Sequence, residues 1–185
     1  MAELFVALIH SPVVDRNGRV VTSAITSLDI HDLARSCRTF GVRAFFIVHP
    51  IEEQRAFAAT IIDHWQSEHG RTFDSRRRDA LNLVEIVVDL HAAIASAEMI
   101  SGERPLLVHT SARTQKGISF AELGSRLRSI NAKPAMILLG TGFGLAPEVL
   151  DRCDVVLEPI RGVDDYNHLS VRAAGSIILD RLRYR

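Results

Sequence analysis

The fold of this chain is decided by residues 138–150, which read LLGTGFGLAPEVL. An apolar run ends at Gly140, two more glycines follow within the next four residues, and Pro147 opens what we expect to be a helix. Glycine adopts backbone conformations that other residues avoid, and it lets main-chain amides come close to a ligand. The stretch therefore predicts a strand, a ligand-binding turn and a helix. A turn that needs glycine only for its dihedral angles is the alternative.

Short apolar runs alternate with segments of helical period on both sides of this stretch. The alternation predicts an α/β fold with a mostly parallel, six-stranded sheet flanked by helices. The expected strands are residues 4–9, 43–48, 83–88, 106–109, 135–139 and 155–158. The expected helices are residues 29–40, 51–69, 89–100, 119–130 and 169–182, with a sixth near Pro147. Ser27 or Asp29 is expected to cap the first helix, and Gly41 to end it.

The connecting segments are least regular at residues 12–26, 70–79 and 110–117. Loops of this length in a compact domain are often functional. Asn17-Gly18 lies between two valine pairs, which indicates a tight turn after the first strand.

The composition is typical of one globular domain, with 185 residues, of which 47% are hydrophobic and 24% charged. No apolar run approaches the roughly 18 residues of a membrane helix, and the first residues do not resemble a signal peptide. We therefore expect a cytoplasmic protein that does not contact membranes. Cys37 and Cys153 form no CxxC pair and the eight histidines form no metal-binding motif, so neither a disulfide nor a metal is expected.

Charge is balanced at 22 basic and 22 acidic residues, so any contact with nucleic acid must come from local patches. All the basic residues except Lys116 and Lys133 are arginines, whose planar fork suits phosphates and base edges. Residues 76–78 are the only run of three basic residues. This run is either a solvated face or, with Arg113 and Lys116, a patch that binds the RNA backbone.

A dinucleotide-binding turn is an alternative for the glycine-rich stretch, because Glu158 follows Gly144 by 14 residues, near where a ribose-binding acid would lie. The dinucleotide fingerprint, however, opens a βαβαβ unit, whereas only 41 residues remain after Gly144. The spacing is also GxGxG rather than GxGxxG. A Walker-type phosphate loop is excluded because no Gly-Lys-Ser/Thr follows.

Two further segments near the C-terminus resemble those of a known family. They are VVLEPIRG at residues 155–162 and DDYNHLSVRAAGSIIL at residues 164–179. With the glycine-rich turn, they resemble the three cofactor loops of the SPOUT, or α/β-knot, methyltransferases. The most specific match is to the helix start of the third loop, and it rests on Asn167, Leu169, Ser170, Val171 and Ala173.

The N-terminal part extends this resemblance. Residues 27–48, SLDIHDLARSCRTFGVRAFFIV, are similar to the family motif that places an arginine on the first helix before a Phe-Gly turn. Arg35 takes the place of that arginine, and Gly41 that of the glycine. Asp29 and Asp32 stand where the ribose-methylating branch carries asparagine and a small residue. The methylated atom, a ribose hydroxyl or a base nitrogen, is therefore left open.

The resemblance covers nearly the whole chain and is closest to a bacterial subgroup of S-adenosylmethionine-dependent RNA methyltransferases, sometimes fused to a tRNA guanine-N1 methyltransferase. It implies one SPOUT domain over residues 1–185, with a deep C-terminal trefoil knot whose cofactor-binding part spans about residues 106–182. It also implies S-adenosylmethionine as cofactor, RNA (tRNA or rRNA) as substrate, and a homodimer formed through the knotted C-terminal face.

Candidate site residues follow from the motifs and the loops. The candidates for catalysis are Arg35, which the motif supports, and Asp164 and Asp165 as proton acceptors. The candidates for RNA binding are Arg38, Arg76, Arg77, Arg78, Arg113 and Lys116. The candidates for cofactor binding are Thr110, Leu139, Gly140, Thr141, Gly142, Gly144, Leu145, Glu158, Pro159, Ile160, Arg161, Gly162, Tyr166, Asn167, His168, Leu169 and Ser170.

Two other functions stay open at this point. A module of the same fold could bind the cofactor or RNA without catalysis, and methyl transfer to RNA separates it from an enzyme. A nucleotide-dependent small-molecule enzyme, such as an oxidoreductase, could instead use the GTGFG loop at residues 140–144. Thermal stabilisation by S-adenosylhomocysteine but not by NAD would exclude that enzyme.

Overall fold

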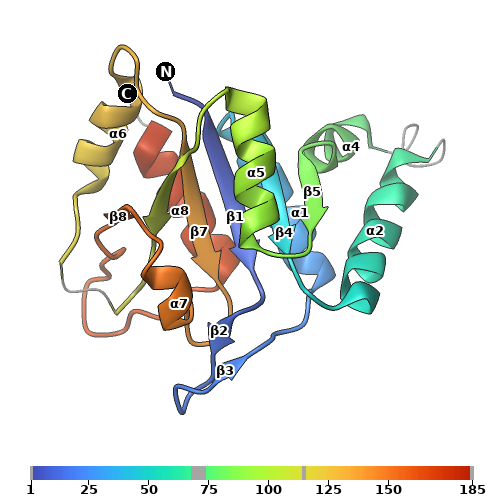
Figure 1. The fold of residues 1–185 in the computed structure, drawn as a ribbon, viewed down its shortest axis with the longest axis horizontal. Coiled ribbons are helices and arrows are strands. Elements are labelled where there is room, and N and C mark those ends of the chain that lie inside the picture. Colours follow the sequence, from blue (N-terminus) through green and yellow to red (C-terminus); the bar gives the residue numbers. More distant parts are fainter. Residues whose placement is uncertain (1, 68–73, 114–115, 184–185) are drawn as a thin grey trace.

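The computed structural model describes residues 2–67, 74–113 and 116–183. Its centre is a six-stranded sheet, paired in parallel throughout, in the order β5-β4-β1-β7-β6-β8 (Figure 1). The strands are β1 (Leu4–Ile9), β4 (Ala44–Val48), β5 (Val84–Val87), β6 (Leu106–His109), β7 (Ala135–Gly140) and β8 (Val155–Val156). The six expected strands and the α/β class are confirmed.

The strands at the centre of the sheet are covered on both faces. Every residue of β1 and β4 is buried, which explains why both read as unbroken apolar runs rather than alternating ones. Along β1 the side chains of Leu4, Val6 and Leu8 enter one core, and those of Phe5, Ala7 and Ile9 enter the other.

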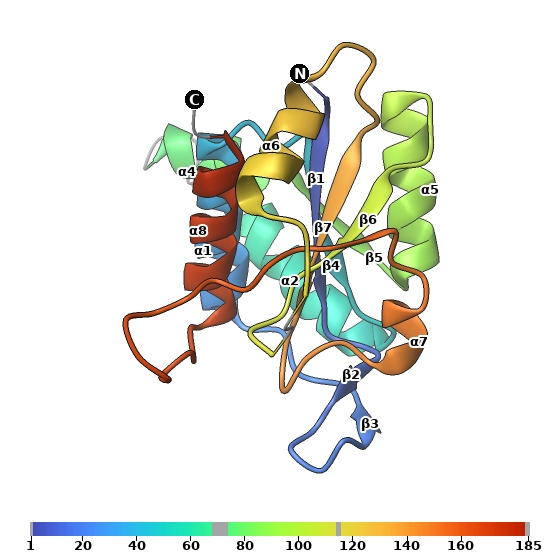
Figure 2. The ribbon, with the colours of Figure 1, turned by 90° about the vertical axis from the view of Figure 1, so that its left-hand side faces the viewer.

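The two faces of the sheet carry different numbers of helices (Figure 2). One face packs against α1 (Ser27–Thr39), α2 (Glu52–Gln66), α4 (Ser75–Leu81), α6 (Phe120–Arg128) and α8 (Val171–Arg183). The other face packs against α5 (Leu90–Ser101) and α7 (Pro147–Leu150). None of the helices seen in the described ranges is both long and apolar enough to cross a membrane.

Two predictions about the helices are wrong. The N-cap of α1 is Thr26 rather than Ser27 or Asp29, since the Thr26 hydroxyl accepts a hydrogen bond from the Asp29 amide at 3.2 Å. The segment expected to be irregular at residues 70–79 includes most of helix α4, which begins at Ser75. Asp74 begins this helix by accepting hydrogen bonds from the next backbone amides, and the helix buries Ala80 and Leu81. The three consecutive arginines leave only two apolar residues in this helix, so the sequence shows no helical periodicity here.

The other helix boundaries agree with the prediction to within two residues, apart from the end of the second helix. That helix was expected to continue to residue 69, but α2 ends at Gln66, and residues 68–73 lie outside the described part of the chain. α7 starts with Pro147 in its first turn, as predicted.

A small hairpin and a long return segment complete the fold. After β1 the chain forms the antiparallel pair β2 (Val13–Val14) and β3 (Val20–Val21), which projects beyond the end of the main sheet (Figures 1 and 2). Its turn contains Gly18 at φ +77°, so the predicted Asn-Gly turn is confirmed.

After β8, at the edge of the sheet, residues 157–170 lead back to α8, which packs against α1, α6 and β7 (Figure 2). A Cβ at Gly175 would lie 2.7 Å from the Leu33 side chain and 3.1 Å from that of Leu139. Glycine therefore lets α8 pack this closely on α1 and the sheet without displacing the two leucine side chains.

Candidate active site

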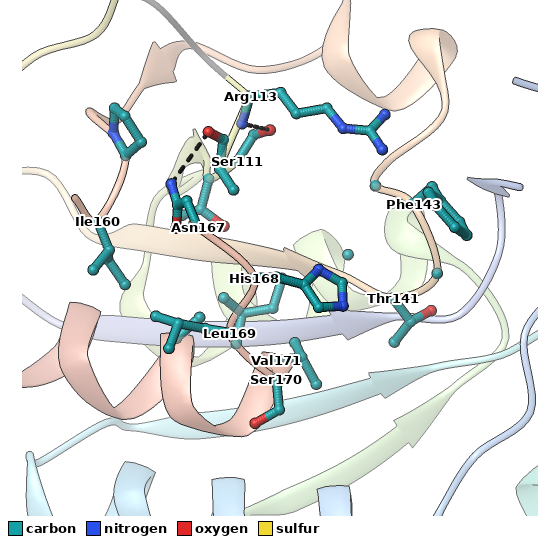
Figure 3. Close-up of a pocket in the computed structure, with 18 of the residues that line it drawn as sticks. Ser111, Arg113, Thr141, Phe143, Ile160, Asn167, His168, Leu169, Ser170 and Val171 are labelled. Atoms are coloured by element: carbon teal, nitrogen blue, oxygen red, sulfur yellow. Dashed lines mark hydrogen bonds between the residues drawn. The ribbon is translucent and has the colours of Figure 1, made fainter. Parts of the chain in front are cut away.

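A pocket of about 750 Å³ lies at the carboxyl ends of β6 and β7 (Figure 3). Pockets of roughly 300–1,000 Å³ suit small molecules, and open parallel sheets bind ligands at this edge. Three segments far apart in the sequence meet here: residues 110–113, 139–144 and 158–171. Ser23 from the connection before α1 and Asp29 from the first turn of α1 also line the pocket. The topology thus collects four separate parts of the chain around one cavity.

The glycine loop at residues 140–144 is fixed by hydrogen bonds to the β2–β3 hairpin. The amide of Phe143 donates to the Val14 carbonyl at 3.0 Å, and the Val14 amide donates to the Gly144 carbonyl at 2.9 Å. Gly142 adopts φ +60°, and a Cβ there would lie 3.1 Å from the Val14 carbonyl oxygen. Both the backbone conformation and this close approach require glycine at position 142.

The first and third segments are joined by a side chain. The Asn167 side-chain amide donates to the Ala112 carbonyl at 3.4 Å, and the Arg113 amide donates to the Ser111 hydroxyl at 3.1 Å (Figure 3). Asn167 therefore helps to hold the return segment against the loop after β6.

Glu158 combines a place in the pocket with a structural role. Its carboxylate accepts a hydrogen bond from the Phe120 amide at 2.8 Å, which satisfies a backbone group at the start of α6. This contact fixes the return segment relative to α6.

An ion pair joins α1 to α8 beside the pocket. The Arg172 guanidinium lies 2.8 Å from the Asp29 carboxylate and 3.4 Å from that of Asp32. The Asp29 side chain is only 10% exposed and also accepts a hydrogen bond from the Thr26 hydroxyl. The two aspartates that depart from the family motif thus share a counter-charge at the start of α8.

Two buried histidines lie next to the pocket, after β1 and β4. Their ring centroids are 5.6 Å apart, and His49 Nδ1 accepts a hydrogen bond from the Ile51 amide. No described group bonds to the ring nitrogens of His10. Burial, with a smaller contribution from His49, lowers the pKa of His10 to about 4, and burial also lowers the pKa of His49. His10 is therefore neutral at pH 7.

The structure brings thirteen of the seventeen cofactor candidates into the pocket lining. The other four are Leu145, Arg161, Gly162 and Tyr166. Leu145 is buried in the core under α5 and α7, because its side chain turns to the opposite face of the sheet. The remaining three are exposed where the return segment bulges away from the pocket.

The three candidates for catalysis are separated. Asp165 lines the pocket, whereas Asp164 accepts a hydrogen bond from the Tyr166 amide at 3.0 Å and does not. Arg35 is exposed on α1 and lines a neighbouring groove between α1 and α8. Ser170 belongs to both the pocket and this groove.

The candidates for RNA binding occupy three places. Arg113 lines the pocket, with its guanidinium 5.6 Å from the centroid of the Phe143 ring, and Lys116 is exposed on the same loop. Arg38 is exposed on α1, and Arg76 to Arg78 lie on α4, of which no residue lines the pocket. Arg77 stacks on Trp65 at 4.5 Å and pairs with Asp74 at 3.8 Å, so it packs against α2.

Several lining residues were not predicted. Phe143, Val171 and Ala174 lie inside motifs that were recognised, so their positions alone could have suggested them. Ser23 and Asp29 carried a weaker signal, because they follow a strand at its carboxyl end. The remaining unpredicted lining residues are Ala24, Ser111, Ala112 and Ile178.

Across residues 2–67, 74–113 and 116–183, no group of three or more His, Cys, Asp or Glu side chains lies close enough together to hold a metal ion.

Solved structures share this fold at low sequence identity. A probable methyltransferase from Bordetella pertussis Tohama I superposes with a TM-score of 0.64 and 19% identity, covering 99% of this chain and 93% of that one. The SpoU methyltransferase AviRb from Streptomyces viridochromogenes, in complex with AdoMet, gives a TM-score of 0.55 and 16% identity, covering 97% and 56%. These similarities define the fold as that of the SpoU-type methyltransferases of the SPOUT class.

The sequence model of the SAM-dependent RNA methyltransferase family matches residues 3–184, and the chain belongs to this family. The family and the cofactor expected from the motifs are confirmed. The chain is 43% identical over 179 residues to a tRNA (guanine-N(1)-)-methyltransferase from Oleidesulfovibrio alaskensis, covering 97% of this chain and 41% of that protein. It is also 38% identical to an uncharacterized protein from Aquifex aeolicus, covering 97% and 87%. The chain thus spans about two fifths of the length of the first relative.

Proposed function

We propose that this protein transfers the methyl group of S-adenosylmethionine to RNA in the cytoplasm, and that the pocket at the carboxyl edge of the sheet holds the cofactor. The observation that supports this most directly is the convergence of residues 110–113, 139–144 and 158–171 on one pocket. These segments contain the loops that the motifs assigned to the cofactor. The relatives named as tRNA methyltransferases favour tRNA over rRNA as the substrate.

The pocket offers groups that suit each part of this cofactor. The glycine loop presents backbone without intervening side chains, and the side chains of Leu139, Ile160 and Val171 suit the faces of an adenine ring. Asn167 and Ser170 can bind polar groups of the ribose or of the amino-acid part. The cofactor supplies a methyl group activated on a sulfonium, and the pocket binds and orients it.

Asp165 is the proposed acceptor of the proton from the RNA nucleophile, because of the two candidate aspartates it is the one that lines the pocket. Asp165→Asn should lower the rate of methyl transfer at least tenfold, within the range that a general base contributes. Asp164→Asn is the matched control and should retain most of the rate. Equal rates in the two variants would remove Asp165 from this role.

We further propose that two copies associate through the α1–α8 face and that Arg35 of each serves the pocket of the other. Arg35 is exposed, and its groove reaches Ser170 at the rim of the pocket. Mixing Arg35→Ala with Gly142→Val tests this directly, because only a mixed dimer contains one complete site. Restored methyl transfer supports the exchange. If a mixed dimer is shown to form and methyl transfer is still absent, the exchange of Arg35 between the two copies is contradicted.

The C-terminal return segment is also proposed to form the trefoil knot. Support comes from the close crossing at Gly117, where a Cβ would lie 2.7 Å from the Leu157 carbonyl carbon and 2.8 Å from the Glu158 nitrogen. A parallel bridge joins Ile118 to Leu157 at the same place. Pulling the chain from residues 2 and 183 should give a shorter final extension than an unknotted chain allows. Full extension would exclude the knot.

The function is tested by mass spectrometry of nucleosides from bulk RNA of a deletion strain, before and after treatment with the purified protein and cofactor. One methylated nucleoside should be missing from the strain and restored by the protein, and its identity gives both the RNA and the atom. Cofactor binding without any new nucleoside would instead indicate a non-catalytic module.

A further inference from the structure

The β2–β3 hairpin is an arm with two arginines near its tip. Asp15 stabilises the turn, since its carboxylate accepts hydrogen bonds from the amides of Asn17 at 2.7 Å and Arg19 at 2.9 Å. Arg16 and Arg19 are exposed, and within the described ranges neither guanidinium pairs with a carboxylate. The arm therefore presents two cations that the fold itself does not use.

The base of this arm is bonded to the pocket. Val14 exchanges two backbone hydrogen bonds with the glycine loop, through Phe143 and Gly144, and Val13 forms a bridge with Leu145. The hairpin thus begins directly beside the loop that lines the pocket. Because both contacts involve backbone, their geometry does not depend on mobile side chains.

An aromatic ring lies between the arm and the pocket. Phe143 is 47% exposed although it is large and apolar, and it also lines the pocket. The Arg113 guanidinium lies 5.6 Å from its ring centroid, within the range of a cation–π contact. We refer to Arg113, Phe143 and the β2–β3 hairpin together as the strip, because Phe143 contacts Arg113 and is bonded through its backbone to Val14 at the base of the hairpin.

We propose that this strip is the RNA-binding surface of the protein, with Arg16 and Arg19 on the phosphate backbone and Phe143 as the platform on which the target base stacks. The proposal rests on the function proposed above and specifies how the RNA is held. Arginines bind phosphates without reading the base, whereas an aromatic ring stacks on an unpaired base. The hairpin arginines are better placed for this than the α4 cluster, where Arg77 is engaged by Trp65 and Asp74.

The test compares two double variants with the same change in charge. Arg16→Gln/Arg19→Gln alters the arm, whereas Arg43→Gln/Lys133→Gln removes two exposed cations where β4 and β7 begin, at the opposite edge of the sheet. Binding of fluorescently labelled bacterial tRNA and rRNA fractions is followed by anisotropy over a series of salt concentrations. Calorimetry with S-adenosylhomocysteine measures the cofactor pocket of each variant.

The arm variant should bind its RNA about tenfold more weakly, and the slope of log affinity against log salt should fall by about 1.5, as expected for two lost phosphate contacts. The control should stay close to the wild type, and all three proteins should bind S-adenosylhomocysteine equally. Phe143→Leu should keep the salt slope and lose at least tenfold in methyl transfer.

Two results would overturn the proposal, and they differ from each other. If the wild type binds RNA and the arm variant shows the same affinity and slope as the control, the hairpin is not the RNA-binding surface, and the proposed function stands. If the wild type binds S-adenosylhomocysteine but neither RNA fraction, the proposed function fails together with the arm.

Discussion

The two edges of the sheet are built differently. At the amino edge short contacts join the elements, such as the Ala2 amide to the Leu127 carbonyl at 2.7 Å and the Leu106 amide to the Pro134 carbonyl at 2.8 Å. At the carboxyl edge the chain forms a hairpin, three long segments, an ion pair and two buried histidines. The strands thus begin at tightly hydrogen-bonded connections and end at a polar pocket. We therefore expect substitutions at the carboxyl edge to impair function more than substitutions at the amino edge.

The largest difference is expected between two glycines with positive φ. Gly142 lies in the pocket at φ +60° and Gly102 ends α5 at φ +83°. Gly142→Val should reduce the affinity for S-adenosylhomocysteine below detection, because the loop must move away from Val14. Gly102→Ala also places a side chain at positive φ, but away from the pocket, and should bind normally. Calorimetry on folded proteins measures both, and normal binding by Gly142→Val would place the cofactor elsewhere.

The second difference is the effect of pH on stability. The pKa of His10 is lowered to about 4, so the folded state binds fewer protons than the unfolded state. Its contribution is therefore fully present above about pH 6.5 and is lost as the pH falls toward 4. Between pH 7 and pH 5 this amounts to about 2 kcal/mol. His10→Leu should reduce the loss of unfolding free energy over this range, measured by urea titration.

His91→Gln on the exposed side of α5 is the control for this titration and should leave the pH dependence as in the wild type. If His10→Leu also leaves it unchanged, the acid sensitivity of the protein has another source. His49 and Asp29 are the titratable neighbours that contribute to the pKa of His10.

The third difference is expected between two kinds of ion pair. Arg172→Ala leaves the nearly buried Asp29 carboxylate without its cation and should destabilise the protein by about 2 kcal/mol. Arg126→Ala breaks an exposed pair with Glu122 on α6 and should cost less than about 0.5 kcal/mol. Adding Asp29→Asn should recover part of the loss in Arg172→Ala. Equal losses of unfolding free energy in Arg172→Ala and Arg126→Ala would contradict the difference expected between the nearly buried pair and the exposed pair.

The smallest effect concerns the α4 arginines. Arg77→Ala removes the stacking on Trp65 and should destabilise the protein by about 1 kcal/mol. Arg76 is exposed, so Arg76→Ala should change the unfolding free energy by less than about 0.5 kcal/mol. Thermal denaturation of both variants measures the difference. A larger loss in Arg76→Ala than in Arg77→Ala would exclude the packing role given to Arg77.

The strands and the pocket loops could be predicted because local sequence determines them. β1 and β7 are apolar runs of strand length, and Gly142 and Gly144 have the positive φ that favours glycine. Helix α4 escaped prediction because it has a single turn of apolar contact beside three arginines. The Asp29–Arg172 pair joins positions 143 residues apart, so only the folded chain reveals it.

The central claim is that the carboxyl-edge pocket delivers a methyl group to RNA. The most direct measurement is transfer of radiolabelled methyl from S-adenosylmethionine to RNA of a deletion strain by the wild type, Gly102→Ala and Gly142→Val. We predict that the first two label the RNA and that Gly142→Val does not, although it remains folded. Labelling by Gly142→Val at the wild-type rate would contradict the claim.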